Sequence, residues 1–213
     1  MNTYSGGTIL NGNLVVGDGN SVGTLGSGAV TGSNGAQLQF LEPATVTIAN
    51  AIGGDGGVFQ AGVGTVILTG ANTYGGGTVV ENTVSTAVLQ VGDGVATSTL
   101  GGPNGFVSDG GVIRFDEGGA VTIGNSITDF SATSTGSVVQ AGPGAVTLNG
   151  VSSYTGLTDV QAGMLVIGDA THTSAQVGGD AQVDAGGALG GYGKILATSA
   201  TPGWSSRAMT SGR

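Results

Sequence analysis

The sequence predicts an all-β protein, a parallel β-helix (solenoid) of roughly eight to ten coils. Three observations lead to this fold class. Glycine supplies 46 of the 213 residues, only 8% of residues are charged, and short runs of Val, Ile, Leu and Thr alternate with Gly, Asn and Asp turns. This glycine content, about three times the usual ~7%, excludes helical bundles, and the absence of a three-residue Gly period excludes collagen.

Internal repeats run through the chain. Residues 58–70 (VFQAGVGTVILTG) match residues 138–150 (VVQAGPGAVTLNG), and each copy continues into a turn that contains Tyr and ends in Thr. These turns are TYGGGT at 73–78 and SYTGLT at 153–158, and the chain opens with a third, TYSGGT at 3–8. The shared order of markers indicates one structural unit used three times.

Each unit also contains a short strand that ends in Gly-Asp. The three copies are LVVGD at 14–18, LQVGD at 89–93 and LVIGD at 165–169. Another pair of strands is QLQF at 37–40 and VIRF at 112–115. Alternating apolar and polar residues between Gly-rich turns predict half-buried strands.

The strands follow one another too closely for the helical crossovers that usually connect parallel strands. A β-helix avoids this need, because each strand stacks on its equivalent one coil later. The sequence therefore predicts one β-helix repeat domain over 1–197, with units near 2–73, 74–153 and 154–197. An irregular C-terminal tail is predicted over 198–213.

Residues 64–78 (GTVILTGANTYGGGT) resemble the autotransporter-associated β-strand repeat of bacterial type V secretion passenger domains. Residues 89–92 and 188–193 are also similar to that family, and the resemblance covers roughly residues 2–197. It implies a right-handed parallel β-helix that is displayed at the bacterial cell surface or secreted. The opening residues show neither the basic nor the apolar region of a signal peptide, so we expect no export signal in this chain.

Composition limits the partners that we expect. The formal net charge is −9, with four Lys and Arg residues, so we expect no nucleic-acid partner and no membrane contact by this fragment. No cysteine is present, so disulfides are excluded. We expect self-association through strand edges, or a surface glycan or protein partner.

A nucleophile-elbow pattern, Gly-x-Ser-x-Gly, places Ser21 as a candidate nucleophile, with Asp159 and His172 completing an esterase triad. With so much glycine, about one such match arises by chance, and no helix follows the motif. We expect His172 to be an exposed loop residue, because a lone histidine does not make a metal site.

Asp18, Asp93 and Asp169 end equivalent strands. Stacked in register they would form a calcium ladder, but several coils separate them. We expect them to act as turn residues that bond their own backbone and tolerate positive φ.

Arg114, Asp116 and Glu117 form the one dense charge cluster, which would suit a β-helical polysaccharide lyase or hydrolase. We expect instead that Arg114 pairs with its acidic neighbours.

The repeated Tyr4, Tyr74 and Tyr154 would suit a sugar-stacking strip. Their recurrence at one place in the unit favours packing, with each hydroxyl reaching a partner.

The sequence thus predicts no catalytic residue, no cofactor and no metal. The expected function is a structural β-helical stalk of an autotransporter-type surface protein that supports adhesion or self-association. The alternatives are a β-helical carbohydrate-active enzyme and then a serine esterase.

Overall fold

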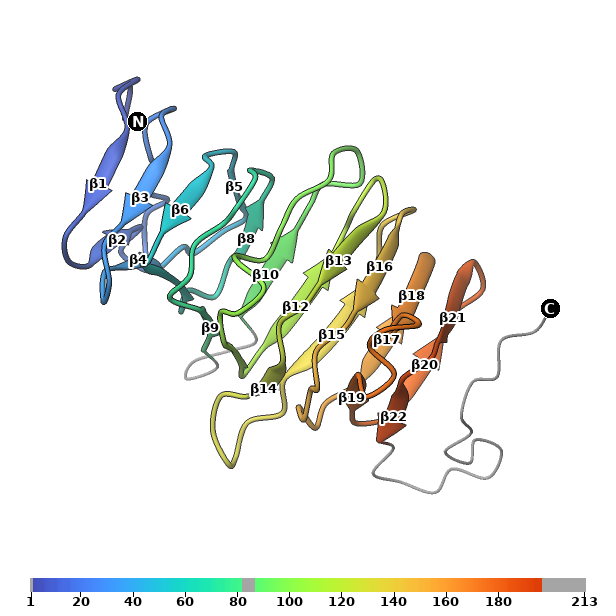
Figure 1. Ribbon diagram of the computed structural model, residues 1–213. Helices are drawn as coiled ribbons and strands as arrows, with labels where there is room; N and C mark the ends of the chain where they lie inside the picture. The colour runs from blue at the N-terminus through green and yellow to red at the C-terminus, as the bar shows by residue number, and fades with distance from the viewer. Residues whose placement is uncertain (1, 82–86, 197–213) are drawn as a thin grey trace.

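The computed structural model describes residues 2–81 and 87–196, which form a parallel β-solenoid of about 8 turns with no helix in those ranges. Figure 1 shows the strands as a staircase from the N-terminal turn to the C-terminal turn. The predicted fold class is confirmed. The predicted tail over 198–213 lies outside the described residues. No described segment is a helix long and apolar enough to cross a membrane.

Three sides of the solenoid carry the strands. The seven-stranded sheet contains β5 (Val46–Ile48), β8 (Thr65–Leu68), β10 (Val88–Val91), β12 (Val112–Phe115), β15 (Ser137–Gln140), β17 (Thr158–Val160) and β20 (Ala181–Val183). The six-stranded sheet contains β2 (Leu14–Val16), β4 (Gln37–Phe40), β7 (Gly57–Gln60), β9 (Thr78–Val80), β11 (Val107–Asp109) and β14 (Ile127–Asp129).

Three smaller sheets contain the remaining strands. The three-stranded sheet contains β1 (Thr8–Leu10), β3 (Val30–Gly32) and β6 (Ile52–Gly54). The four-stranded sheet contains β13 (Val121–Ile123), β16 (Ala145–Leu148), β18 (Gly163–Ile167) and β21 (Gly187–Gly191). The two-stranded sheet contains β19 (Gln176–Gly178) and β22 (Lys194–Leu196). The chain visits the sides in cyclic order, as in β3, β4, β5 and then β6.

The core is a set of apolar columns inside the coil. In the seven-stranded sheet, inward positions alternate with outward ones, so that Val66, Leu89 and Ile113 stack in register and are all fully buried. A second column beside it contains Leu68, Val91 and Phe115. Each turn therefore buries its apolar side chains against those of the turns before and after it, which is how solenoids gain stability.

The sequence unit is longer than a whole number of turns. From β2, three turns along the six-stranded sheet lead through β4 and β7 to β9, and the equivalent strand β10 is the next one, in the seven-stranded sheet. From β10, three turns again lead to β17, and the third equivalent strand, β18, lies in the four-stranded sheet. Equivalent residues of successive units therefore lie on different sides of the solenoid, each one side further around the axis. They do not stack into one column.

Candidate functional site

The three repeated aspartates each close the loop that follows their strand. In each, the Oδ1 atom accepts hydrogen bonds from two backbone N–H groups. Asp18 accepts those of Asn20 (2.9 Å) and Ser21 (2.6 Å), and Asp93 accepts those of Val95 and Ala96 (both 3.1 Å). Asp169 accepts those of Thr171 (2.8 Å) and His172 (3.0 Å). These hydrogen bonds favour the charged form, so the pKa of Asp18 and of Asp93 lies below its usual range. The pKa of Asp169 is lowered further, chiefly by the side chains of Thr171 and His172.

The prediction that these aspartates bond to the backbone of their turns is confirmed. The prediction that they adopt a positive φ is wrong. No described residue other than glycine has a positive φ. The left-handed conformation belongs to the preceding glycines, Gly17 (φ 80°), Gly92 (φ 86°) and Gly168 (φ 67°). The three aspartates follow strands of three different sheets, so their carboxylates do not converge on one ion. The described residues contain no group of three or more His, Cys, Asp or Glu side chains suited to a metal ion.

The residues of the hypothetical esterase triad lie far apart. Ser21 precedes β5 along the chain, and His172 follows β17. These two strands are five steps apart in the seven-stranded sheet, or about 24 Å at about 4.8 Å per step. The Nδ1 atom of His172 instead lies 2.8 Å from Asp169 Oδ1 on the exposed loop, so the prediction of an exposed loop histidine is confirmed.

The charge cluster at residues 114–117 separates into outward and inward side chains. Arg114 donates from Nη1 to Gln161 Oε1 at 3.1 Å, two turns further along the solenoid. Asp116 Oδ2 accepts a hydrogen bond from Gln90 Nε2 at 3.3 Å, and Glu117 is fully buried. The expectation that Arg114 pairs with its acidic neighbours is therefore wrong, because strand alternation points Arg114 outward while Glu117 turns into the coil.

The repeated tyrosines are packing residues. Tyr74 OH lies 2.8 Å from Thr78 Oγ1 and Tyr154 OH lies 2.6 Å from Thr158 Oγ1, and both rings are buried. Burial raises the pKa of both hydroxyls above the ordinary tyrosine value. Tyr4 makes the same hydrogen bond to Thr8 Oγ1 but remains 38% exposed. The packing interpretation is confirmed. The three threonine partners begin β1, β9 and β17, which belong to three different sheets.

Glu117 of the charge cluster and Glu42, which the sequence did not indicate as a site residue, are buried at equivalent positions. Glu42 accepts hydrogen bonds from the Gly23 N–H at 3.2 and 3.1 Å, and Glu117 accepts one from the Ser98 N–H at 2.8 Å. Each carboxylate therefore satisfies a backbone donor of the preceding turn. Burial raises the pKa of both groups, that of Glu117 to about 7. The sequence signal for their equivalence is a phenylalanine two residues before each glutamate. Phe40 ends the strand 37–40 and Phe115 ends the strand 112–115.

A third buried carboxyl, Asp109, lies beside Asp129 on the next rung of the ladder. Asp109 Oδ1 accepts the Gly111 N–H at 2.9 Å, and its Oδ2 has no hydrogen-bond partner. Asp129 accepts hydrogen bonds from Gly136 N–H (2.8 Å) and from Thr155 Oγ1 (2.8 Å). Burial, with a smaller contribution from the charge of Asp129, raises the pKa of Asp109 to about 7. Each of the two carboxyls thus accepts a backbone N–H group, and one oxygen of Asp109 has no hydrogen-bond partner.

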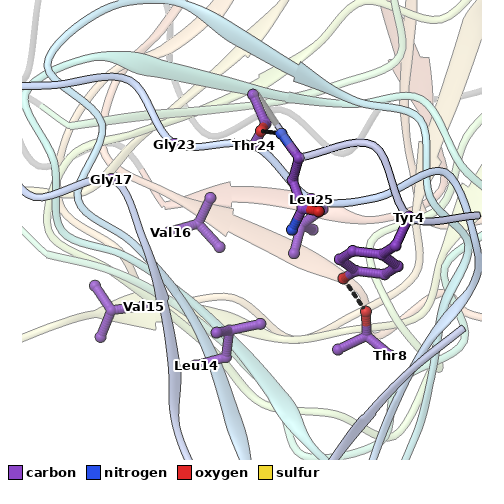
Figure 2. A pocket seen from close by; sticks show the side chains of 10 residues that line it. Tyr4, Thr8, Leu14, Val15, Val16, Gly17, Gly23, Thr24 and Leu25 are labelled. Atoms are coloured by element: carbon purple, nitrogen blue, oxygen red, sulfur yellow. Dashed lines mark hydrogen bonds between the residues drawn. The ribbon is translucent and has the colours of Figure 1, made fainter.

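Two open hollows lie at the N-terminal end of the solenoid. One has a volume of about 390 Å³ and is lined by Tyr4, Thr8, Leu14, Val16 and Leu25 among others. Figure 2 shows Leu14, Val16 and Leu25 around this opening, with the Tyr4 ring beside Thr8 at its edge. The second, of about 490 Å³, shares Tyr4 and Leu25 and extends to Ile48. Neither hollow contains a carboxylate or a histidine.

Comparison with known proteins agrees with the repeats. Residues 58–82 and 138–167 match the family described as Passenger-associated-transport-repeat. The chain is also similar to the Adhesin BmaC autotransporter of Brucella suis biovar 1 (strain 1330), with 30% identity over 223 residues. That similarity covers 86% of this chain and 6% of the relative, so the chain spans a small part of the length of that protein. No solved structure matches the chain significantly.

Proposed function

We propose a structural role for this chain, which is a stretch of autotransporter passenger β-helix and carries the passenger-associated-transport-repeat. In this proposal the solenoid is a stiff, non-catalytic stalk at the bacterial cell surface or in secreted form. It supports adhesion or self-association by holding the binding parts of a longer protein away from the membrane.

One observation carries the stalk proposal. Seven outward residues of the seven-stranded sheet stack in unbroken register, one per turn: Thr47, Ile67, Gln90, Arg114, Val139, Asp159 and Gln182. Six steps of about 4.8 Å give a rise of about 29 Å along this side. The hydrogen bonds between successive turns run along the axis, so that bending the rod would stretch those on the outer side of the bend.

The support for adhesion is coarser. The relative is named an adhesin, and the exposed loops carry large apolar side chains such as Val95 (84% exposed) and Phe106 (58% exposed). With a net charge of −9, the surface favours a protein or a neutral glycan over an anionic partner.

A bead assay tests the adhesion role. Beads coated with the chain should bind cultured host cells, or one another, more than beads coated with a Gly92→Asp variant. This variant should disrupt the fold around this turn, because Gly92 has a φ of 86° and an added Cβ would lie 2.3 Å from Asp116 O. Equal attachment of the two bead types would contradict adhesion by the folded chain.

An assay for polysaccharide degradation tests the non-catalytic part of the proposal. Incubation with a panel of polysaccharides should release neither reducing ends nor unsaturated products. Release that Glu117→Gln or Asp109→Asn abolishes, with the fold intact, would overturn the stalk proposal in favour of the carbohydrate enzyme.

A further inference from the structure

Five residues in the outward column of the seven-stranded sheet are arranged symmetrically about Val139. Arg114 and Asp159 lie one rung away from Val139 on either side, and the next rungs carry Gln90 and Gln182. Figure 1 shows their strands, β10, β12, β15, β17 and β20, in this order along the staircase. A half-turn about the strand direction at Val139 therefore brings the cation to the place of the anion, and each amide to the place of the other.

The two charged residues of this column have no opposite charge as a partner. Arg114 donates one hydrogen bond, to Gln161, and forms no ion pair with any residue in 2–81 or 87–196. A guanidinium group has five N–H donors, so most of its donors remain unused. Asp159 Oδ2 accepts a hydrogen bond from Gln161 Nε2 at 2.8 Å, and Asp159 Oδ1 has no hydrogen-bond partner. One face of the chain thus carries a cation and an anion that both lack a counter-charge.

The column on one side of these residues has the same symmetry, with apolar side chains. Its central residue is Ser137, on the rung of Val139, and Val112 precedes it by one rung. Leu157 follows by one rung, since the Val138 N–H donates to Leu157 O at 3.0 Å. Val112 is partly exposed and Leu157 is 39% exposed. The same half-turn exchanges Val112 with Leu157, so that one apolar side chain takes the place of another.

The column on the other side carries groups that can hydrogen-bond to each other. The Ala141 N–H donates to Phe115 O and the Gln161 N–H donates to Gln140 O, both at 2.8 Å, so the register continues one residue past these strands. Asp116, Ala141 and Gln161 therefore lie on successive rungs, and all three are partly exposed. The half-turn exchanges Asp116 with Gln161, which places a carboxylate acceptor where an amide offers two N–H donors.

We propose that this face of the seven-stranded sheet is the contact surface between two antiparallel copies of this chain, related by a two-fold axis along the strand direction at Val139. Arg114 of each copy lies opposite Asp159 of the other, and the two Val139 side chains meet at the centre. A two-fold contact of this kind uses the same patch on both copies, so the patch has to be complementary to itself. This inference deepens the self-association named in the proposed function and rests on it.

The charges select the antiparallel arrangement. In a parallel arrangement Arg114 lies opposite Arg114 and Asp159 opposite Asp159, and like charges in contact oppose association. The chain carries a net charge of −9, so two copies repel each other in general. The two Arg–Asp pairs of the antiparallel dimer offset this repulsion at the contact itself, and therefore fix its register more than its strength.

The size of the face predicts a weak and reversible contact. Four steps of about 4.8 Å from Gln90 to Gln182 give a height of about 19 Å, which is small for a stable interface. Chains held together on one surface contribute many such contacts at once, so a weak contact between two rods becomes strong between two arrays.

Sedimentation equilibrium of the full chain at concentrations up to about 1 mM measures the association. The native chain should form dimers. Arg114→Asp and Asp159→Arg should each weaken the dimer at least tenfold, because each sets like charges opposite one another. Lys194→Asp and Asp55→Arg are matched controls, since they make the same changes of charge at exposed positions outside this sheet. Both controls should associate within about twofold of the native chain.

An equimolar mixture of Arg114→Asp and Asp159→Arg chains gives the sharpest test. One chain then carries two anions and the other two cations at the paired positions, so the mixed dimer should form within about threefold of the native affinity. Recovery also shows that both variants are folded. A native chain that stays monomeric up to about 1 mM, or a mixture that associates no better than either variant alone, would overturn the proposal.

Clumping of coated beads separates failure of this contact from failure of the proposed function. Beads that carry the Arg114→Asp chain should clump less than beads that carry the native chain. If both clump equally, self-association uses another surface and the proposed function stands without this contact. If native beads neither clump nor attach to host cells, the proposed function itself fails.

Discussion

Glu117 and Ser98 join two turns of the solenoid, since the buried Glu117 carboxylate accepts the Ser98 N–H at 2.8 Å. Glu42 repeats this contact with Gly23 in the first unit. The space around Glu117 is closed by glycines, because a Cβ at Gly142 would lie 2.3 Å from the Glu117 backbone nitrogen. A carboxyl side chain thus links neighbouring turns where a regular strand would use a backbone carbonyl.

Replacing Glu117 by alanine should lower the free energy of unfolding by about 2–3 kcal/mol. The variant leaves the Ser98 N–H buried without an acceptor and creates a void. Glu117→Gln keeps an acceptor oxygen and should cost less than half as much at pH 6. Urea denaturation of the two variants measures the difference, and equal losses would show that the contact to Ser98 has no stabilising role.

The buried carboxyls should make the chain more stable in mild acid than in mild base. The pKa of Asp109 and of Glu117 is raised to about 7 in the fold, whereas both groups ionise near pH 4 when unfolded. The folded state therefore binds more protons between these values, and stability falls as pH rises from about 4 to about 7, by up to about 1.4 kcal/mol per pH unit for each group. Below about pH 4 the trend reverses, because the lowered pKa values of Asp18, Asp93 and Asp169 make their protonation destabilising.

Thermal unfolding between pH 5 and pH 8 measures this dependence. The midpoint should fall across the range, and the double variant Asp109→Asn with Glu117→Gln should show a flatter profile. A native midpoint that rises from pH 5 to pH 8 would contradict the assignment of these groups as buried acids.

The tyrosine hydroxyls offer a matched set of three substitutions. Tyr74→Phe and Tyr154→Phe each remove a buried hydrogen bond to threonine and should each cost about 1 kcal/mol of unfolding free energy. Tyr4→Phe removes the same contact at a partly exposed site and should cost little, since water replaces the lost partner. Three equal costs would mean that Tyr4 is as buried as its equivalents.

Glycine at the Gly-Asp turns should be irreplaceable. Gly92→Ala places a Cβ 2.3 Å from Asp116 O on a backbone with a φ of 86°, and should cost more than about 2 kcal/mol. Gly12→Ala is the control, because a Cβ there meets nothing within 4 Å and its φ is not positive. The control should stay within about 1 kcal/mol of the native chain, as measured by chemical denaturation, and a similar loss in both variants would contradict the turn geometry.

The fold was predictable because its determinants are local and repeated. Alternation in LQVG and VIRF gives strands, and the Gly-Asp pairs give the turns, so copies of the same signals indicate stacking without any knowledge of register. What the sequence does not contain is the position of a unit around the axis. The shift by one side arises because each unit covers three turns and one further strand. The turns also differ in length: Val46 pairs with Val66, 20 residues on, whereas Ile113 pairs with Val138, 25 residues on.

The candidate site residues were less predictable for a different reason. The contacts of Arg114 and Glu117 depend on which side of the backbone each side chain faces. Strand β12 ends at Phe115, between these two residues. The alternation of partly exposed and buried positions continues beyond Phe115 through Asp116 to Glu117. A carboxylate is seldom fully buried, so this pattern by itself did not suggest that Glu117 faces inward. Asp109 and Asp129 are 20 residues apart, and only the register of β11 with β14 brings them together.

Distance measurement along the outward column tests the central claim most directly. The chain has no cysteine, so spin labels at Thr47→Cys and Gln182→Cys report one distance by pulsed electron paramagnetic resonance. The six-step ladder predicts a narrow distribution near 29 Å, and moving the second label to Asp159→Cys should shorten it by about 5 Å. A broad distribution, or no shortening between the two pairs, would contradict a parallel solenoid with one rung per turn.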